Sequence, residues 1–457
     1  MTEESNHKIC IIGAGLAGSD AAYFLAEKGL KVVLVESKRL QLGPAQKIPQ
    51  FAELVCTNSL KSKDPNSGHG LLKGEMEAFG SLVLKAGYEH AVPAGEALAV
   101  DREKFSQAVT EKLQAHPNIT IVDEIVENPL QTADKHGCHY VIQATGPLAT
   151  PKLEQWLNDE VSDGDLYFYD AIAPIVDADS LDYSKLYFKD RHVPIKSVEE
   201  GEQADYLNAP MNKEQYDAFV AALVEADKVQ PKNFEKPNFF DACLPIDLMA
   251  ERGLDTPRHS CMKPIGLELA DGKRPYAVVQ LRKENLLGTA FNLVGFQTRL
   301  TYKEQVRIFR MIPGLEEATF IHLGSVHRNT FLNAKKTLEF DLSSKRFPRL
   351  HFAGQMTGVE GYTESAACGL YVAFQVWRKI QGLEPVRFPV ETALGALVNY
   401  LMTSENPRPS NINFGLLPPV QLSSYKGLKR FERKKKKKEM ASERAREKFS
   451  QMMQSLD

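Results

Sequence analysis

The sequence contains no run of about 20 apolar residues, the length that a helix needs to cross a bilayer. Its first residues, MTEESNHK, are polar and acidic and do not resemble a secretory signal peptide. Only six cysteines occur among 457 residues, widely scattered and without CxxC pairs or zinc-ligand spacing. These absences argue against a membrane protein, a disulfide-stabilised secreted protein and a metal site. We therefore predict a cytoplasmic protein with reduced thiols and no bound metal.

Net charge is also nearly absent, at −3, but the charged residues are unevenly distributed. Residues 425–457 hold 12 Lys/Arg and 5 Asp/Glu, whereas the rest of the chain holds 44 and 54. This basic, helix-prone tail is either a solvated or frayed end or an electrostatic arm for RNA, because phosphate attraction needs only clustered Lys and Arg. Charge alone leaves both interpretations open.

The first 36 residues predict a βαβ unit with a glycine-rich turn. KICII reads as a buried strand, GAGLAG as a turn, SDAAYFLAEKG as a helix and KVVLVE as a second strand. The GxGxxG glycines allow a tight turn, approach of the backbone to a pyrophosphate, and close packing of helix on strand. An acid that ends the second strand is placed to accept hydrogen bonds from ribose hydroxyls. The predicted cofactor-binding residues here are Gly13, Ala14, Gly15, Leu16, Ala17, Gly18 and Glu36.

Two later segments favour FAD over a nicotinamide dinucleotide at this fold. The Glu36 carboxylate would repel a 2′-phosphate, which argues against NADP in this position. Each later segment follows a predicted strand, and the second leads into a helix with small residues in its first turns. That helix dipole can stabilise negative charge on a reduced flavin. The additional cofactor-binding residues predicted here are Thr145, Gly146, Gly354, Gln355, Gly361 and Tyr362.

The chain is long enough for two or three domains, and its middle differs in character from its ends. We predict an α/β fold in which a Rossmann-like FAD-binding domain is interrupted by a smaller, mixed α/β inserted domain. The FAD-binding domain is expected over residues 1–180 and 331–424, the inserted domain over 181–330, and the basic tail over 425–457.

Two cysteines stand in contexts that suggest chemistry. Cys56 follows the βαβ unit in a segment that can run back toward a flavin, and Cys243 precedes Leu244-Pro245 in a turn that can present a thiol. Redox pairing of Cys56 would need a distant partner, since no other cysteine occurs before Cys138. Simple burial is the alternative for both thiols. Packing is the expected role of the other four: Cys10, Cys138, Cys261 and Cys368.

Motifs spread over nearly the whole chain resemble the bacterial folate- and FAD-dependent tRNA (uracil-5-)-methyltransferases of the TrmFO type. The wobble-uridine modification flavoproteins share the fold and the region around GVEGY, but not this pair of cysteine contexts. The motifs that carry the resemblance are IIGAGLAGSDAA, FAELVCTNSLKS, VPAGEALAVDR, ACLPIDLMAERG, KPIGLE, KRPYAVVQLR, NLVGFQT, RMIPGL, HRNTF, FAGQMTGVEGYTESAACGL and NINFGLLPP.

The resemblance implies methylation of uridine at C5 in tRNA, normally at T-loop position 54. The implied carbon donor is 5,10-methylenetetrahydrofolate, the reductant is FAD hydroquinone, and NADPH or NADH reloads the flavin. By motif matching, Cys243 is the expected nucleophile at uracil C6 and Cys56 lies beside the flavin. Oligomeric state is left open.

This sequence departs from the family pattern at several positions. Thr57 stands where serine is common and Lys61 where arginine is common; Asp241-Ala242 replace Glu-Gly, and Cys368 takes a place often held by serine. Three alternatives remain: the same chemistry on a uridine of 23S rRNA, a flavin-dependent thiol oxidoreductase, and a non-catalytic FAD-containing RNA-binding protein.

Overall fold

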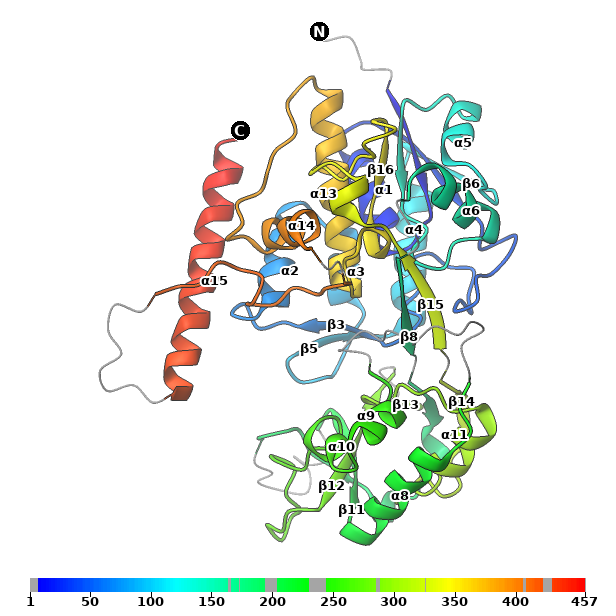
Figure 1. The fold of residues 1–457 in the computed structure, drawn as a ribbon, viewed down its shortest axis with the longest axis vertical. Helices are drawn as coiled ribbons and strands as arrows, with labels where there is room; N and C mark the ends of the chain where they lie inside the picture. The colour runs from blue at the N-terminus through cyan, green and yellow to red at the C-terminus, as the bar shows by residue number, and fades with distance from the viewer. Residues whose placement is uncertain are drawn as a thin grey trace.

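The computed structural model describes residues 7–162, 166–171, 173–193, 204–229, 244–284, 288–324, 326–405, 408–421 and 430–456. Cys243 lies outside these residues. The described residues form two parts, each with its own hydrophobic core, drawn one above the other in Figure 1. The first part is built from segments on both sides of the second part in the sequence, as the predicted fold class expects.

A parallel five-stranded sheet forms the centre of the first part, in the order β16-β7-β1-β2-β6. The apolar runs KICII and KVVLVE are buried along most of their length, as expected for a parallel sheet that is covered on both faces. The last strand comes from beyond the insertion and completes the sheet. The strands are β1 (Lys8–Ile12), β2 (Lys31–Glu36), β6 (Ile119–Asp123), β7 (Tyr140–Gln143) and β16 (Leu350–Phe352).

Two helices from opposite ends of the chain, α1 (Leu16–Glu27) and α13 (Tyr362–Ile380), pack closely on each other. A Cβ atom on Gly369 would lie 2.1 Å from the carbonyl oxygen of Ala17, so glycine is required for this approach. Residues 68–89 form two helices, because Ser67 and Ser81 each cap a separate N-terminus. The other helices of this part are α2 (Gly68–Ala78), α3 (Leu82–Glu89), α4 (Arg102–Ala115), α5 (Pro129–Lys135), α6 (Pro151–Glu160), α12 (Ala334–Thr337), α14 (Ala393–Thr403) and the 3₁₀ helix η4 (Gly354–Thr357).

A small antiparallel sheet of β3 (Ser59–Ser62), β5 (Ala97–Val100) and β4 (Ala91–Val92) lies on the side of the first part that faces the insertion (Figure 1). A buried carboxylate ties distant helices together in the same part. Glu75 of α2 accepts hydrogen bonds from the backbone N–H groups of Ala393 at 2.6 Å and Leu394 at 2.8 Å, at the start of α14. The N-terminal and C-terminal segments therefore complete one core.

The second part is an antiparallel six-stranded sheet, in the order β10-β11-β12-β13-β9-β14, with helices packed against it. Because β9 begins at Ile175, this sheet starts before the boundary expected at residue 181. Its strands are β9 (Ile175–Asp177), β10 (Tyr187–Phe188), β11 (Tyr206–Met211), β12 (Ala277–Lys283), β13 (Ala290–Leu293) and β14 (Phe320–His322). Its helices are η1 (Ala178–Ser180), η2 (Tyr183–Lys185), α8 (Lys213–Glu225), α9 (Ile246–Arg252), α10 (Thr256–His259) and α11 (Tyr302–Phe309).

A two-stranded antiparallel ribbon of β8 (Leu166–Ala171) and β15 (Val326–Phe331) joins the two parts (Figure 1). Its register pairs Leu166 with Phe331 and Ala171 with Val326. The chain leaves the first part along one strand of the ribbon and returns along the other.

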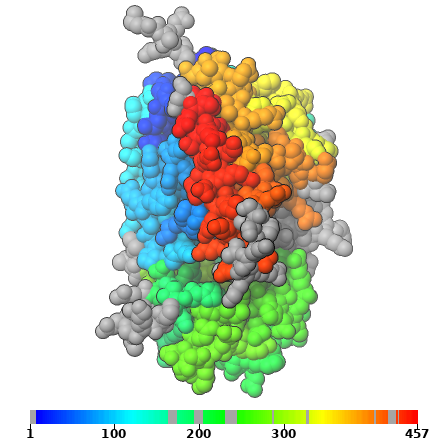
Figure 2. Space-filling view, turned by 90° about the vertical axis from the view of Figure 1, so that its left-hand side faces the viewer, coloured from blue at the N-terminus to red at the C-terminus, as the bar shows by residue number. Residues whose placement is uncertain are grey.

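The basic tail forms a single helix, α15 (Arg430–Gln454), that lies along the first part (Figures 1 and 2). The Phe449 ring is 6.0 Å from that of Phe79 and 6.4 Å from that of Phe388, centroid to centroid. Ala441, Ala445 and Met452 are also buried on this side of the helix. The interpretation as a frayed end is therefore wrong over this helix. Among the described helices, none is both long and apolar enough for a membrane crossing.

Candidate active site

The glycine turn between β1 and α1 has the geometry that the GxGxxG pattern predicts. Gly13 adopts a φ of +96°, and a Cβ atom there would lie 2.6 Å from the carbonyl oxygen of Ala144. A Cβ atom on Gly18 would lie 1.8 Å from the carbonyl oxygen of Gly13. Both positions therefore exclude any side chain. The N-cap residue of α1, Gly15, provides no side-chain cap.

Glu36 holds this turn in place from the end of β2. Its Oε2 accepts the backbone N–H of Ala14 at 2.6 Å, and its Oε1 accepts the N–H groups of Ser37 at 2.7 Å and Lys38 at 3.0 Å. The carboxylate is buried at the carboxyl edge of the sheet. Its hydrogen bonds to the turn are a role that the sequence reasoning did not anticipate, and its contact with ribose stays a prediction.

Two further glycines of the predicted cofactor site, Gly146 and Gly354, follow the strands on one side of β1 in the sheet. Gly146 has a φ of +74° and Gly354 a φ of +76°, after β7 and β16. No heavy atom lies within 4 Å of a Cβ built on Gly146. Thr145 accepts a hydrogen bond from Gln143 at 2.8 Å, and Gln355 donates to both carboxylate oxygens of Glu360 at 3.0 Å.

These residues fit an adenine dinucleotide that carries a flavin. The turn excludes side chains where a pyrophosphate would approach, and the first backbone N–H groups of α1 (Leu16, Ala17 and Gly18) point out of an N-terminus without a side-chain cap. The Oε1 atom of Gln143 is buried without a hydrogen-bond partner, as is expected of a group that faces a ligand. The arrangement supports the predicted cofactor residues, whose individual contacts stay predictions.

The loop that carries Cys56 turns back onto the glycine turn after β2. The backbone N–H of Ala52 donates to the carbonyl oxygen of Ala14 at 2.9 Å, and Ala52 adopts a positive φ of 50°. The ammonium of Lys38 is 2.9 Å from the Glu53 carboxylate, and both side chains are buried. A strained backbone and a buried ion pair thus fix the start of this loop.

Tyr362, the first residue of α13, binds the loop at the cysteine itself. Its hydroxyl oxygen accepts the backbone N–H of Cys56 at 2.6 Å and that of Thr57 at 3.2 Å. Burial raises the pKa of the Tyr362 hydroxyl, and the neighbouring Cys56 raises it further. The phenol therefore stays neutral and keeps its proton at physiological pH. Cys56, which is partly exposed, is held next to the helix that was expected to face the flavin.

Side chains from the inserted part close over the same loop. The guanidinium of Arg282, at the end of β12, donates to the Thr57 hydroxyl at 2.5 Å. Arg102 of α4 donates to the carbonyl oxygen of Cys56 at 3.3 Å and forms an ion pair with Glu284 at 2.8 Å. Two arginine side chains therefore contact the loop that contains the candidate reactive thiol, and the charge of one of them, Arg102, is paired with Glu284. Because either serine or threonine supplies the hydroxyl, the departure at position 57 keeps this contact.

The first turn of α13 already contains a buried carboxylate. Glu364 accepts the backbone N–H of Ile412 at 3.0 Å, and its Oε1 lies 3.1 Å from the Nε2 atom of His69. Its second oxygen is buried without a hydrogen-bond partner. The dipole at this N-terminus is therefore partly compensated by the protein, and its effect on a reduced flavin stays a prediction.

The other described cysteines are free thiols in packed surroundings. Desolvation raises the pKa of the Cys261 thiol to about 12, and burial raises that of Cys368 to about 11. Cys10 and Cys138 share a hydrogen bond that lowers the pKa of Cys138 and raises that of Cys10. Their proximity was not anticipated. Among the described residues, no group of three or more His, Cys, Asp and Glu side chains is placed to hold a metal ion.

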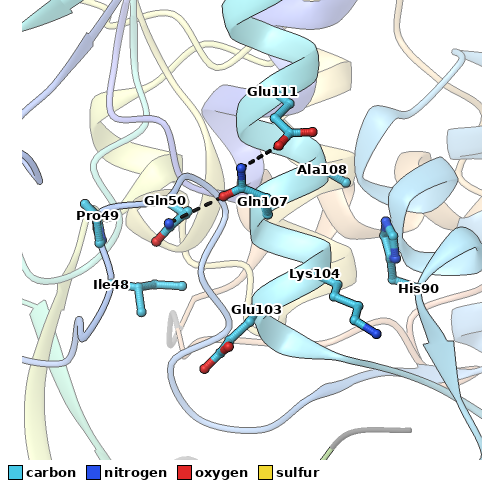
Figure 3. A pocket seen from close by; sticks show the side chains of 9 residues that line it. All are labelled: Ile48, Pro49, Gln50, His90, Glu103, Lys104, Gln107, Ala108 and Glu111. Atoms are coloured by element: carbon cyan, nitrogen blue, oxygen red, sulfur yellow. Dashed lines mark hydrogen bonds between the residues drawn. The ribbon is translucent and has the colours of Figure 1, made fainter.

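A surface cavity of about 610 Å³ lies between α4 and the segment that leads to the Cys56 loop (Figure 3). Gln50 bridges this segment to the helix through a 3.4 Å hydrogen bond to Gln107. None of the predicted site residues lines the cavity, so it is separate from the candidate active site. Its lining residues are Ile48, Pro49, Gln50, His90, Glu103, Lys104, Gln107, Ala108 and Glu111.

Comparison with known proteins agrees with this geometry. Residues 8–384 match the family described as Glucose inhibited division protein A. A methylenetetrahydrofolate–tRNA-(uracil-5-)-methyltransferase TrmFO from Aquifex aeolicus (strain VF5) is 47% identical over 444 residues, which cover 96% of this chain and 95% of that protein. The chain belongs to the TrmFO family. A TrmFO from Enterococcus faecalis is 45% identical over 453 residues, covering 98% of this chain and 99% of that protein.

Solved structures support the fold. Form I of Aquifex aeolicus GidA superimposes with a TM-score of 0.66 at 16% identity, over 97% of this chain and 76% of that chain. Form II gives a TM-score of 0.64 at 16% identity, over 90% and 70%. At this identity the likeness concerns the fold alone, and it agrees with the predicted α/β class.

Sequence reasoning missed the residues that clamp the Cys56 loop. Arg102 ends the motif VPAGEALAVDR and Arg282 ends KRPYAVVQLR, both among the motifs that carry the TrmFO resemblance. The signal was therefore present, but one sequence does not show which partners these arginines bind. Cys243 lies outside the described residues, so its role as the nucleophile stays a prediction.

Proposed function

We propose that this chain is a cytoplasmic enzyme that methylates C5 of the T-loop uridine of tRNA at position 54. The carbon comes from 5,10-methylenetetrahydrofolate, and NADPH or NADH supplies the electrons through FAD. Near full-length identity to TrmFO enzymes supports the activity. The structural observation that carries the proposal is the 2.6 Å hydrogen bond from Cys56 N–H to Tyr362, which holds a thiol loop beside the dinucleotide fold.

The chemistry explains the need for a thiol. Carbon C5 of uracil is a weak nucleophile, and addition of a thiolate to C6 gives it enolate character. We assign this addition to Cys243 from its motif. C5 then forms a bond to the donated methylene carbon, a base removes the C5 proton, and the bond from that carbon to the folate nitrogen breaks. A hydride, which bound reduced FAD would supply, completes the methyl group as the C6–S bond breaks. Uridine, methylenetetrahydrofolate and reduced FAD would thus give 5-methyluridine, tetrahydrofolate and oxidised FAD.

The described residues prepare this reaction by positioning. The glycine turn and the N-terminus of α1 would bind the FAD pyrophosphate, and Gly146 leaves open space after β7. Tyr362 orients the backbone of Cys56 and Thr57, and its own hydroxyl group keeps its proton. Arg282 and Glu284 bring the inserted part onto the same loop, and the Cys243 motif ACLPIDLMAERG belongs to this part, earlier in the sequence.

The test uses purified holoenzyme, tRNA and 23S rRNA transcripts, NADPH, and methylenetetrahydrofolate with a labelled methylene carbon. Label in 5-methyluridine at tRNA position 54 is expected. With RNA containing 5-fluorouridine, Cys243→Ala should abolish the covalent adduct, while Cys368→Ser, a matched control at a buried thiol, should keep it.

Other outcomes decide among the alternatives. Label confined to 23S rRNA changes the target, and methyl transfer only from S-adenosylmethionine overturns the folate donor. Rapid reduction of disulfides without RNA modification favours a thiol oxidoreductase. Tight RNA binding with FAD bound but no turnover favours a non-catalytic protein. An adduct that persists in Cys243→Ala and disappears in Cys56→Ala exchanges the roles of the two thiols.

A further inference from the structure

The helix α15 has two halves with different surroundings. Ala441, Ala445, Phe449 and Met452 recur at helical spacing and are buried against the first part of the molecule. Arg446 adds a 3.0 Å hydrogen bond to the carbonyl oxygen of Pro65. The other half contains five consecutive lysines, 434–438, of which 435–438 are exposed. The C-terminal half is therefore an anchor, and the N-terminal half presents a lysine surface, defined here as Lys435–Lys438.

The run of lysines in this half opposes helix stability, and an ion pair one turn apart, 4.0 Å between Lys435 and Glu439, offsets part of this effect. Lysines three and four positions apart repel one another on a helix surface. The first turn of α15 carries Glu432 as its acidic residue, and the last turn carries no basic residue, whereas cations are favoured at a C-terminus. Such an arrangement of charges lowers the stability of the helix. Unfavourable local choices of this kind are expected at surfaces that have a function.

Contacts connect the lysine surface to the candidate active site. The ammonium of Lys438 lies 5.7 Å from the centre of the Phe414 ring. Two residues earlier, the N–H of Ile412 donates to Glu364 in the first turn of α13, the turn that starts at Tyr362 and holds Cys56. The surface is thus linked to the Cys56 loop through one short segment of chain.

The position of the helix agrees with this connection. The Arg430 end of α15 points toward the level at which the two parts of the molecule meet (Figure 1). In the space-filling view, the lower end of the red helix approaches the green inserted part (Figure 2). Outside residues 425–457 the chain holds 44 basic and 54 acidic residues, so this surface is a concentrated positive region on an acidic body.

We propose that the lysine surface binds the phosphate backbone of the RNA substrate next to the target uridine. This inference rests on the proposed function and identifies where the body of the tRNA lies while one uridine reaches the active site. Lysines act on phosphates as mobile point charges without reading bases. The surface therefore increases the affinity for RNA and makes binding depend on salt, whereas the active site selects the target nucleotide.

The experiment compares Lys435→Gln/Lys436→Gln/Lys438→Gln with Lys112→Gln/Lys263→Gln/Lys303→Gln, which removes three exposed lysines from separate places. Binding of unmodified tRNA to full-length holoenzyme is measured between about 50 and 200 mM KCl. We expect the first variant to bind roughly tenfold more weakly and to lower the slope of log affinity against log salt by about 2. The loss should appear in KM for tRNA and not in kcat. The corresponding triple arginine variant should bind as the wild type does.

Separate measurements distinguish the two proposals. Absence of 5-methyluridine with the wild-type enzyme contradicts the proposed function. Methylation by the wild type combined with unchanged affinity, KM and salt slope in the glutamine variant overturns the lysine surface. Equal weakening in the control variant, or lysine-dependent binding to phosphatidylserine vesicles with unchanged tRNA affinity, also overturns it.

Discussion

Replacement of Tyr362 by phenylalanine tests how the Cys56 loop is held. The change removes one oxygen atom and leaves the ring in place, so that the N–H groups of Cys56 and Thr57 lose their acceptor. An unpaired, partly buried N–H costs about 1 kcal/mol, at the low end of the range for buried groups. The loop should therefore be destabilised by about 2 kcal/mol, equivalent to roughly 30-fold faster exchange of these two amide hydrogens under native conditions.

Hydrogen–deuterium exchange followed by mass spectrometry measures this effect on peptides covering residues 52–60. Tyr371→Phe is the matched control, because Tyr371 lies on the same helix but donates its hydroxyl proton to the carbonyl oxygen of Phe340. Exchange in the loop should be unchanged in this control. Wild-type exchange rates at Cys56 and Thr57 in Tyr362→Phe would refute the assigned acceptor. Methylation should slow in Tyr362→Phe while FAD stays bound.

Two further predictions concern the cofactor turn and pH. Gly18→Ala places a Cβ atom 1.8 Å from a carbonyl oxygen and should yield protein without flavin absorbance near 450 nm, whereas Gly74→Ala, in open space on α2, should keep the flavin and gain about 0.5–1 kcal/mol. Burial raises the pKa of Glu75 from 4.5 to about 7, so its contribution to stability is present below pH 4.5 and is lost as pH rises through 7. The free energy of unfolding of Glu75→Gln, relative to that of the wild type, should therefore rise by up to about 3 kcal/mol between pH 5 and 8, as measured by urea unfolding. Parallel curves of stability against pH for the two proteins would contradict this.

Local features of the fold were predictable because their causes are local. The strands and the helix of residues 8–36 follow from apolar runs and glycine spacing. The bounds of both strands agree with the structure, whereas the helix expected over residues 19–29 begins three residues earlier, at Leu16, and ends at Glu27. Gly13 and Gly18 could be assigned because a side chain at either position meets backbone atoms. The acid at Glu36 could be placed at a strand end, although its bonds to the turn could not be foreseen.

Contacts between distant segments were not predictable from this single sequence. Tyr362 and Cys56 are 306 positions apart, and Arg282 and Thr57 are 225 apart, so no periodicity links them. The tail is a different case. Its buried residues recur at helical spacing in the sequence, but the lysine run directed attention to charge and away from the apolar stripe that anchors Phe449.

The interrupted sheet has a consequence for synthesis on the ribosome. All six strands of the inserted sheet lie within residues 175–322, so they are translated before β16 and α13. The first part, begun at the N-terminus, still lacks its edge strand, the helix against α1 and the backbone groups that Glu75 binds. The inserted part begins later in the sequence than the first part, but all strands of its sheet are synthesised first. The nascent N-terminal segment must wait with apolar surface exposed, which is when chaperone binding to this chain is expected to be greatest.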